Sequence, residues 1–127
     1  MNLKRSLPSS RSSPGQSRAV LGEALDGLVP AKTLETAQLL TSELVTNSAR
    51  HAGTPEGLID LAIHHSADSL RVEVTDQGRG FETGRGRPDL GGGSGWGLWL
   101  VEELATRWGL LRDPTRVWFE LDLSPIV

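Results

Sequence analysis

Three polar residues recur at every fourth position in a stretch whose other residues suit a buried helix. The stretch is SELVTNSARHAG, residues 42–53, and the three are Glu43, Asn47 and His51. Side chains four residues apart lie on one face of an α-helix. A carboxylate there can accept a proton from a hydroxyl or a water, and an amide oxygen can coordinate Mg²⁺ without adding negative charge. The stripe therefore suits a phosphate–metal site, although a solvated helix face gives the same pattern.

A carboxylate followed by two glycines forms a second candidate site. Residues 76–80, DQGRG, come directly after an alternating strand pattern. Glycines after a strand let the backbone approach a flat ligand closely. The carboxylate of Asp76 could accept a hydrogen bond from the exocyclic amine of adenine, whereas guanine carries a carbonyl acceptor at that position. The motif alone also fits an ordinary polar turn.

A glycine-rich run that leads into a helix is the third candidate. Residues 91–98 read GGGSGWGL, and regular helical spacing of apolar residues begins at Leu98. A helix N-terminus offers unpaired N–H groups and the positive end of its dipole, both of which suit phosphate. The run has neither the lysine of a Walker A loop nor the strand context of a Rossmann unit. A flexible linker is the alternative interpretation.

The spacing of apolar residues predicts the elements that must hold these motifs. We expect helices over about 13–28, 31–52 and 98–108, and strands over 59–64, 70–75 and 116–123. Ser13 can cap the first helix, with Pro14 as its first helical residue. The two middle strands are joined by a short turn and should form an antiparallel hairpin. We expect residues 1–14 to be an N-terminal tail or an edge strand, and residues 15–127 to be a single domain.

Composition narrows the class of protein. The formal net charge is −3, so no basic field favours nucleic acid or an anionic membrane as a partner. Cysteine is absent, which excludes disulfides and thiolate metal sites and suits the cytoplasm. No apolar run is long enough for a transmembrane helix, and the N-terminal segment lacks the apolar block of a signal peptide. We therefore expect a cytoplasmic protein.

The order of the three motifs is more specific than any one of them. A helix with Glu-x-x-x-Asn precedes two strands, then DxGxG, then a glycine-rich segment that opens a helix. In this the chain resembles the GHKL superfamily of ATP-binding domains, which have the Bergerat fold. Residues 43–47 match its N box, residues 76–80 its first glycine box and residues 93–98 its second. The resemblance spans residues 15–123. It implies an α+β two-layer sandwich, in which about three helices cover one face of a mostly antiparallel, mixed sheet.

The resemblance also implies roles for individual residues. Glu43 would be the catalytic general base, Asn47 would bind the Mg²⁺ that bridges the ATP phosphates, and Asp76 would bond the adenine amino group. The further positions implied to bind nucleotide are Arg50, Gly78, Gly80, Gly93, Gly95, Gly97 and Leu98. The family gives His51 no fixed role. Many relatives carry Gly-Lys or Gly-Thr before the last strand, whereas residues 112–116 read RDPTR here. We therefore assign no adenine contact to that turn.

Within the superfamily, the chain is most similar to small bacterial anti-sigma factor serine kinases. Residues 42–52 match their helix closely, the segment between the glycine boxes is short, and the endings at 107–109 and 117–121 are typical of stand-alone domains. A sensor histidine kinase would need a helix pair carrying the phosphoacceptor histidine, which residues 1–14 cannot supply. The resemblance implies a Mg-ATP-dependent protein serine/threonine kinase. It would phosphorylate a serine of an anti-anti-sigma protein and sequester a sigma factor, and the family also allows a homodimer.

Two other functions are compatible with these motifs. A non-catalytic ATP-binding regulator could switch partners without transferring phosphate. A structural domain could retain the three boxes as relics. The presence of Glu43 and Asn47 together argues against both.

Overall fold

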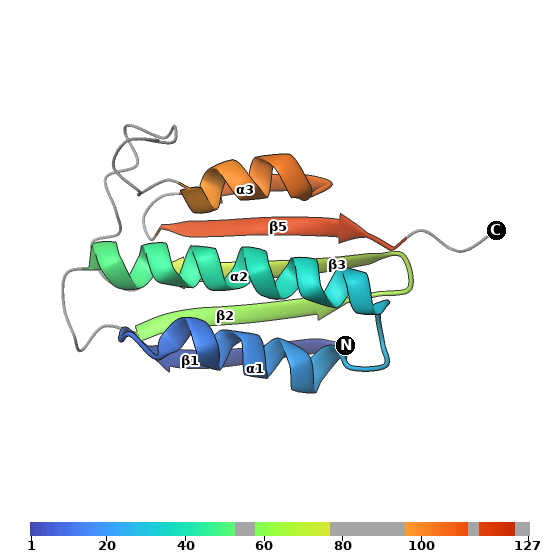
Figure 1. Cartoon of the computed structure of the whole chain (residues 1–127), viewed down its shortest axis with the longest axis horizontal. Helices are drawn as coiled ribbons and strands as arrows, with labels where there is room; N and C mark the ends of the chain where they lie inside the picture. The colour runs from blue at the N-terminus through green and yellow to red at the C-terminus, as the bar shows by residue number, and fades with distance from the viewer. Residues whose placement is uncertain (53–57, 77–95, 112–114, 124–127) are drawn as a thin grey trace.

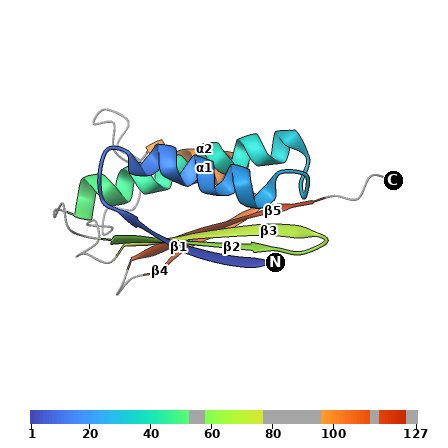
Figure 2. The same cartoon turned by 90° about the horizontal axis from the view of Figure 1, so that it is seen from below.

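The computed structural model describes residues 1–52, 58–76, 96–111 and 115–123. In chain order the elements are β1 (Asn2–Pro8), α1 (Ser13–Leu25), α2 (Ala31–Ala52), β2 (Leu58–His65), β3 (Ser69–Asp76), α3 (Trp96–Leu104), β4 (Arg107–Leu111) and β5 (Arg116–Asp122). The strands form one five-stranded sheet in the order β1-β2-β3-β5-β4. All three helices lie on one side of the sheet (Figures 1 and 2). The expected α+β two-layer fold is confirmed. The expected mixture of strand directions is not, because each pair among the described strands is antiparallel.

The N-terminal segment is an edge strand of this sheet, one of its two expected forms. β1 pairs with β2 along its whole length, and a short connection leads from it into α1. Ser13, the first residue of α1, is fully buried. Its hydroxyl donates to the carbonyl of Pro8 and accepts from the amide of Ser10 at 3.0 Å. The N-cap residue of α1 is Ser12 rather than the expected Ser13, and its side chain forms no capping hydrogen bond, while the Ser13 side chain bonds to the end of β1.

The first helix ends earlier than its apolar spacing suggested. α1 stops at Leu25, whereas the sequence pattern continued to Leu28. Gly27 adopts a φ of 81°, in the left-handed region that ends many helices. Leu28 is consequently 48% exposed instead of contributing to the buried face.

A short strand, β4, was missed from the sequence. Trp108 lies four residues after Leu104, a spacing that fits a continued helix, and we placed it there. In the structure α3 ends at Leu104, and Trp108 pairs with Phe119 of β5. Trp108 and Leu110 pack against the core and alternate with Arg107, Gly109 and the exposed Leu111, which is the period of a strand. Five residues of alternation were too few to outweigh the helical spacing.

The core fills the space between the helices and the sheet. Its strand residues alternate along each strand, so that every second side chain points toward the helices. Its largest fully buried side chain is Phe119. The other buried apolar residues include Leu21, Leu25, Leu40, Leu44, Val45, Ile59, Leu61, Ile63, Leu70, Val72, Val74, Leu98, Val101, Val117 and Leu121.

The other face of the sheet, covered by no described helix, is called the open face below. Over β3, β5 and β4 it carries a network of ion pairs. Glu120 joins Arg71 at 2.9 Å and Arg107 at 2.8 Å, Arg71 also joins Glu73 at 2.8 Å, and the guanidinium of Arg71 lies 4.1 Å from the centre of the Trp118 ring. Hydrogen bonds from Arg107 and Arg71 lower the pKa of Glu120 below its usual value. Burial opposes the charge on Arg71, but its bonds to the two glutamates outweigh burial and raise its pKa.

Among the described helices, none combines the length and apolar character that a membrane crossing requires.

Candidate functional site

The polar stripe of the sequence lies on α2, the long helix that spans the predicted residues. α2 packs against α1, α3 and β3, so it is the central helix of its layer (Figure 1). Leu44 and Val45 are buried against the sheet at 2% and 0% exposure. Asn47 is 8% exposed and Glu43 is half-buried, so both lie at the margin of the packed face. The hydrophobic packing of the helix therefore fixes where these two polar side chains stand.

Glu43 and Asn47 are not engaged by the rest of the described chain. Within the described residues, neither side chain forms a hydrogen bond or an ion pair. Two nearby hydroxyls do have partners. Ser42 donates to the carbonyl of Leu39 at 3.0 Å, and Thr46 donates to the carbonyl of Ser42 at 2.7 Å. Polar groups in or near a protein interior normally have partners. A carboxylate and an amide one helical turn apart are therefore available to a ligand.

Asp76 is the last residue of β3 and is completely buried, at 0% exposure. Its place in the strand alternation puts it on the same side as Val74, toward the helices, while Thr75 points to the open face. Its amide donates to the carbonyl of Thr115 at 2.8 Å. A buried carboxylate is costly unless it is hydrogen-bonded, so this position suits a directed polar contact rather than contact with water.

Thr115 is a residue of this site that the sequence reasoning missed. It is 6% exposed and lies immediately before β5, bonded through its carbonyl to Asp76. The signal was present in the strand period, because Thr115 has the same parity as Val117 and Phe119, which are core residues. The departure of residues 112–116 from the family pattern had led us to assign nothing to this turn.

The ends of four elements meet at this place. Figure 1 shows the C-terminal end of α2, the start of α3 and the start of β5 at one end of the molecule. The end of β3 lies there too, because Thr75 pairs with Arg116. Leu98, in the first turn of α3, is 6% exposed and packs in the core, so it holds the helix start against the sheet. Asn47, Asp76 and the N-terminus of α3 are thus brought to a common end of the fold.

Several predicted positions fall outside this description. Gly78, Gly80, Gly93 and Gly95 lie outside the described residues. The backbone of Arg50 and His51 belongs to α2 and that of Gly97 to α3, but nothing beyond the backbone is described at these three positions.

No group of three or more His, Asp or Glu residues that could hold a metal by itself occurs in the described part of the chain. Such a group is unnecessary for a nucleotide-bound Mg²⁺. Mg²⁺ usually keeps several waters and takes one or two protein ligands together with substrate phosphates. A single amide oxygen from Asn47 fits that coordination.

Comparison with known protein families shows which family this chain belongs to. The model of the histidine kinase-like ATPase domain matches residues 8–119, most of the chain. The chain belongs to the histidine kinase-like ATPase domain family. It is an ATPase domain of this type, which agrees with the GHKL resemblance of its motifs and with ATP as its nucleotide.

A solved structure supports the same relationship. This ATPase domain is similar to the Erythrobacter litoralis EL346 blue-light activated histidine kinase, with 26% sequence identity and a TM-score of 0.60. The match covers 92% of this chain and 46% of that one, so the domain spans about half the length of that kinase. No curated protein matched the chain significantly.

Proposed function

We propose that this ATPase domain is a Mg-ATP-dependent protein serine/threonine kinase of the anti-sigma type. It would phosphorylate a serine of an anti-anti-sigma protein and sequester a sigma factor. The observation that carries the proposal is the pair Glu43 and Asn47, one turn apart and without partners in the described chain. The pair lies on the helix whose C-terminal end meets the end of β3 and the start of α3.

Nucleotide selection is the task of Asp76. Its buried carboxylate would accept a hydrogen bond from the adenine amino group, and the Thr115 carbonyl would keep the backbone of Asp76 in place. Guanine would present a carbonyl to the same carboxylate. Two acceptors facing each other in a buried site cannot bond, which disfavours guanine nucleotides.

Phosphate binding is the task of Asn47 and the start of α3. Mg²⁺ bound by the Asn47 amide oxygen would neutralise the phosphates, and the N-terminus of α3 would face them with backbone N–H groups. Phosphoryl transfer depends mainly on positioning and charge neutralisation, which these groups supply.

Proton transfer is the task of Glu43. The acceptor hydroxyl oxygen would bond to the γ-phosphorus as the bond to the β–γ bridging oxygen breaks, and ADP would leave. The hydroxyl proton would pass to the Glu43 carboxylate. Glu43 is more exposed than Asn47, which suits an acceptor that arrives on a second protein.

The test is phosphate transfer from γ-labelled ATP to purified anti-anti-sigma proteins of the source organism. Glu43→Gln should slow transfer by about 10²- to 10⁴-fold and keep Mg-ATP binding. Glu35→Gln, an exposed glutamate two turns earlier on α2, is the matched control and should transfer normally. Tight Mg-ATP binding by the unaltered protein without transfer to any of these proteins would instead select the non-catalytic partner-switching function.

The similarity to a histidine kinase favours a second acceptor, a histidine ring. Acid treatment of the labelled product separates the two acceptors. A serine phosphoester survives dilute acid, whereas a phosphohistidine loses its phosphate.

A further inference from the structure

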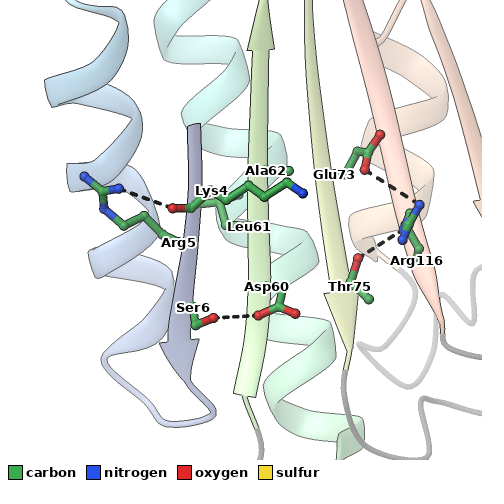
Figure 3. A pocket seen from close by; sticks show the side chains of 9 residues that line it. All are labelled: Lys4, Arg5, Ser6, Asp60, Leu61, Ala62, Glu73, Thr75 and Arg116. Atoms are coloured by element: carbon green, nitrogen blue, oxygen red, sulfur yellow. Dashed lines mark hydrogen bonds and ion pairs between the residues drawn. The ribbon is translucent and has the colours of Figure 1, made fainter. Parts of the chain in front are cut away.

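A hollow lies on the open face, on the opposite side of the sheet from the nucleotide-binding residues. Its volume is about 390 Å³, within the range of small-molecule pockets. It spans β1, β2, β3 and β5, and Figure 3 shows it from the solvent side. The lining residues are Lys4, Arg5, Ser6, Asp60, Leu61, Ala62, Glu73, Thr75 and Arg116.

The strand register explains why the sheet is hollowed here. Lys4, Ala62 and Glu73 are direct neighbours across three strands. Ala62 is the smallest side chain of this row, so the row dips between a lysine and a glutamate. The same row continues over β5 with the bulky Trp118, which does not line the hollow. The hollow therefore lies over β1, β2 and β3 and reaches β5 at Arg116.

The carboxylates at the hollow are already engaged. Asp60 accepts a hydrogen bond from the Ser6 hydroxyl at 2.7 Å. Glu73 takes a short ion pair from Arg71 at 2.8 Å through one oxygen, and its other oxygen faces Arg116 at 3.9 Å. The charge of Glu73 is therefore balanced mainly by Arg71, while Asp60 contributes a hydrogen-bonded carboxylate.

Lys4 and Arg116 at the hollow have few bonds to carboxylates within the described residues. The side chain of Lys4 extends over Ala62 toward β3 (Figure 3), and its ammonium forms no ion pair within the described residues. Arg116 donates to the Thr75 hydroxyl at 3.2 Å, and its other contact within the described residues is the long one with Glu73. Lys4 from β1 and Arg116 from β5 thus point into one hollow with donor capacity left over, whereas the Arg5 side chain turns away and donates to the Lys4 carbonyl (Figure 3).

We propose that this hollow is a second binding site, which takes a small molecule carrying phosphate or carboxylate groups between Lys4 and Arg116. Both side chains would donate charge-assisted hydrogen bonds to its anionic oxygens. The Thr75 hydroxyl, which accepts from Arg116, lies beside them and adds an uncharged donor. The site is separate from Mg-ATP, because Thr75 faces the hollow while Asp76, its neighbour in β3, faces the helices.

The competing explanation for Lys4 is protection of an edge strand. Charged residues and proline often keep edge strands from pairing with other chains, and β1 has both. A lysine with that function alone would contribute nothing to anion binding, and its removal would favour self-association instead.

The experiment titrates the ¹⁵N-labelled full chain with inorganic phosphate and, separately, with citrate, at ionic strength matched by sodium chloride. Amide shifts should move saturably at Ala62, Thr75 and Arg116. Lys4→Gln and Arg116→Gln should each weaken the apparent affinity by about tenfold, as expected for one lost charged hydrogen bond. Lys32→Gln, which removes the other lysine of the chain from the exposed start of α2, should leave the affinity unchanged.

A change of opposite sign sharpens the test. Asp60→Asn removes a negative charge at the hollow and keeps the acceptor for Ser6, so it should tighten binding several-fold. Mg-ATP binding by Lys4→Gln should equal that of the unaltered protein. Absence of saturable shifts with both anions, or equal affinity in Lys4→Gln, would overturn the second site. Self-association of Lys4→Gln with no change in anion affinity would assign Lys4 to edge protection.

Discussion

On the helix-covered side of the sheet, Glu43 and Asn47 form no side-chain hydrogen bond within the described residues, whereas over β3, β5 and β4 on the open side arginines and carboxylates bond one another. In the network of Arg71, Glu120 and Arg107, the charges form ion pairs with one another. Its loss should therefore alter stability and leave nucleotide binding alone. Substitutions of Glu43, Asn47 or Asp76 should instead alter nucleotide binding or phosphate transfer and leave stability nearly unchanged.

The largest expected effect comes from the helix-covered side. Asp76→Asn replaces a fully buried acceptor by an amide that cannot offer two acceptor oxygens to adenine. The dissociation constant for Mg-ATP should rise roughly 10- to 100-fold. Isothermal titration calorimetry measures it, and urea unfolding should show little loss of stability. Asp68→Asn, at an exposed turn, is the control; equal ATP affinity in both variants would remove Asp76 from the site.

The next effect lies on the open face, where Gly109 touches Trp118. A Cβ atom at Gly109 would come within 2.5 Å of the indole nitrogen, so the ring would have to leave its place beside Arg71. Gly109→Ala should lower the free energy of unfolding by about 1–3 kcal/mol. Urea denaturation measures this change, and Mg-ATP affinity should persist.

Gly15→Ala is the matched control for that substitution. Its added Cβ would lie 3.6 Å from the Arg18 guanidinium, in ordinary contact, so stability should hold or rise slightly. If Gly109→Ala unfolded at the same urea concentration as Gly15→Ala, the indole would not be fixed over β4.

The smallest effect concerns a single network carboxylate. Glu120→Gln should cost about 1 kcal/mol of unfolding free energy at neutral pH. The folded pKa of Glu120 lies below its ordinary value of 4.5, so the contribution is complete above that pH. It is lost as pH falls through the lowered pKa, when the folded state must also take up the proton.

Unfolding curves at a series of pH values check that window. The difference between Glu120→Gln and the unaltered protein should shrink as the solution becomes acidic. Glu23→Gln, an exposed glutamate of α1, should show no such convergence. A difference that stayed constant down to strongly acidic pH would mean that packing, rather than charge, explains the cost.

The length of an element decided whether it could be predicted from the sequence. Periodicity predicted α2 as residues 31–52 and placed β2 and β3 correctly to within one residue, because long amphipathic elements repeat their signal many times. It failed at β4, where Trp108 satisfies helical and strand spacing at once. Local sequence signals were too short there to decide.

In the candidate site, too, local features could be predicted from the sequence and long-range ones could not. Glu43, Asn47 and Asp76 could be predicted because each belongs to a motif contained within a few residues. The strand period indicated that Thr115 is buried, but its bond to Asp76 could not be predicted, since it depends on which strands become neighbours. Arg71 and Glu120 were hidden for the same reason: they are 49 positions apart and meet only through the pairing of β3 with β5.

The hydrogen bond from the Asp76 amide to the Thr115 carbonyl closes the last step of the β3–β5 pairing. Strand pairs open most readily at their ends, with far less free energy than global unfolding. Each opening at this end would displace the carboxylate that we propose binds adenine. Nucleotide affinity therefore includes the fraction of time that this terminal bond is closed. Bound nucleotide should in turn slow hydrogen exchange at the Asp76 amide.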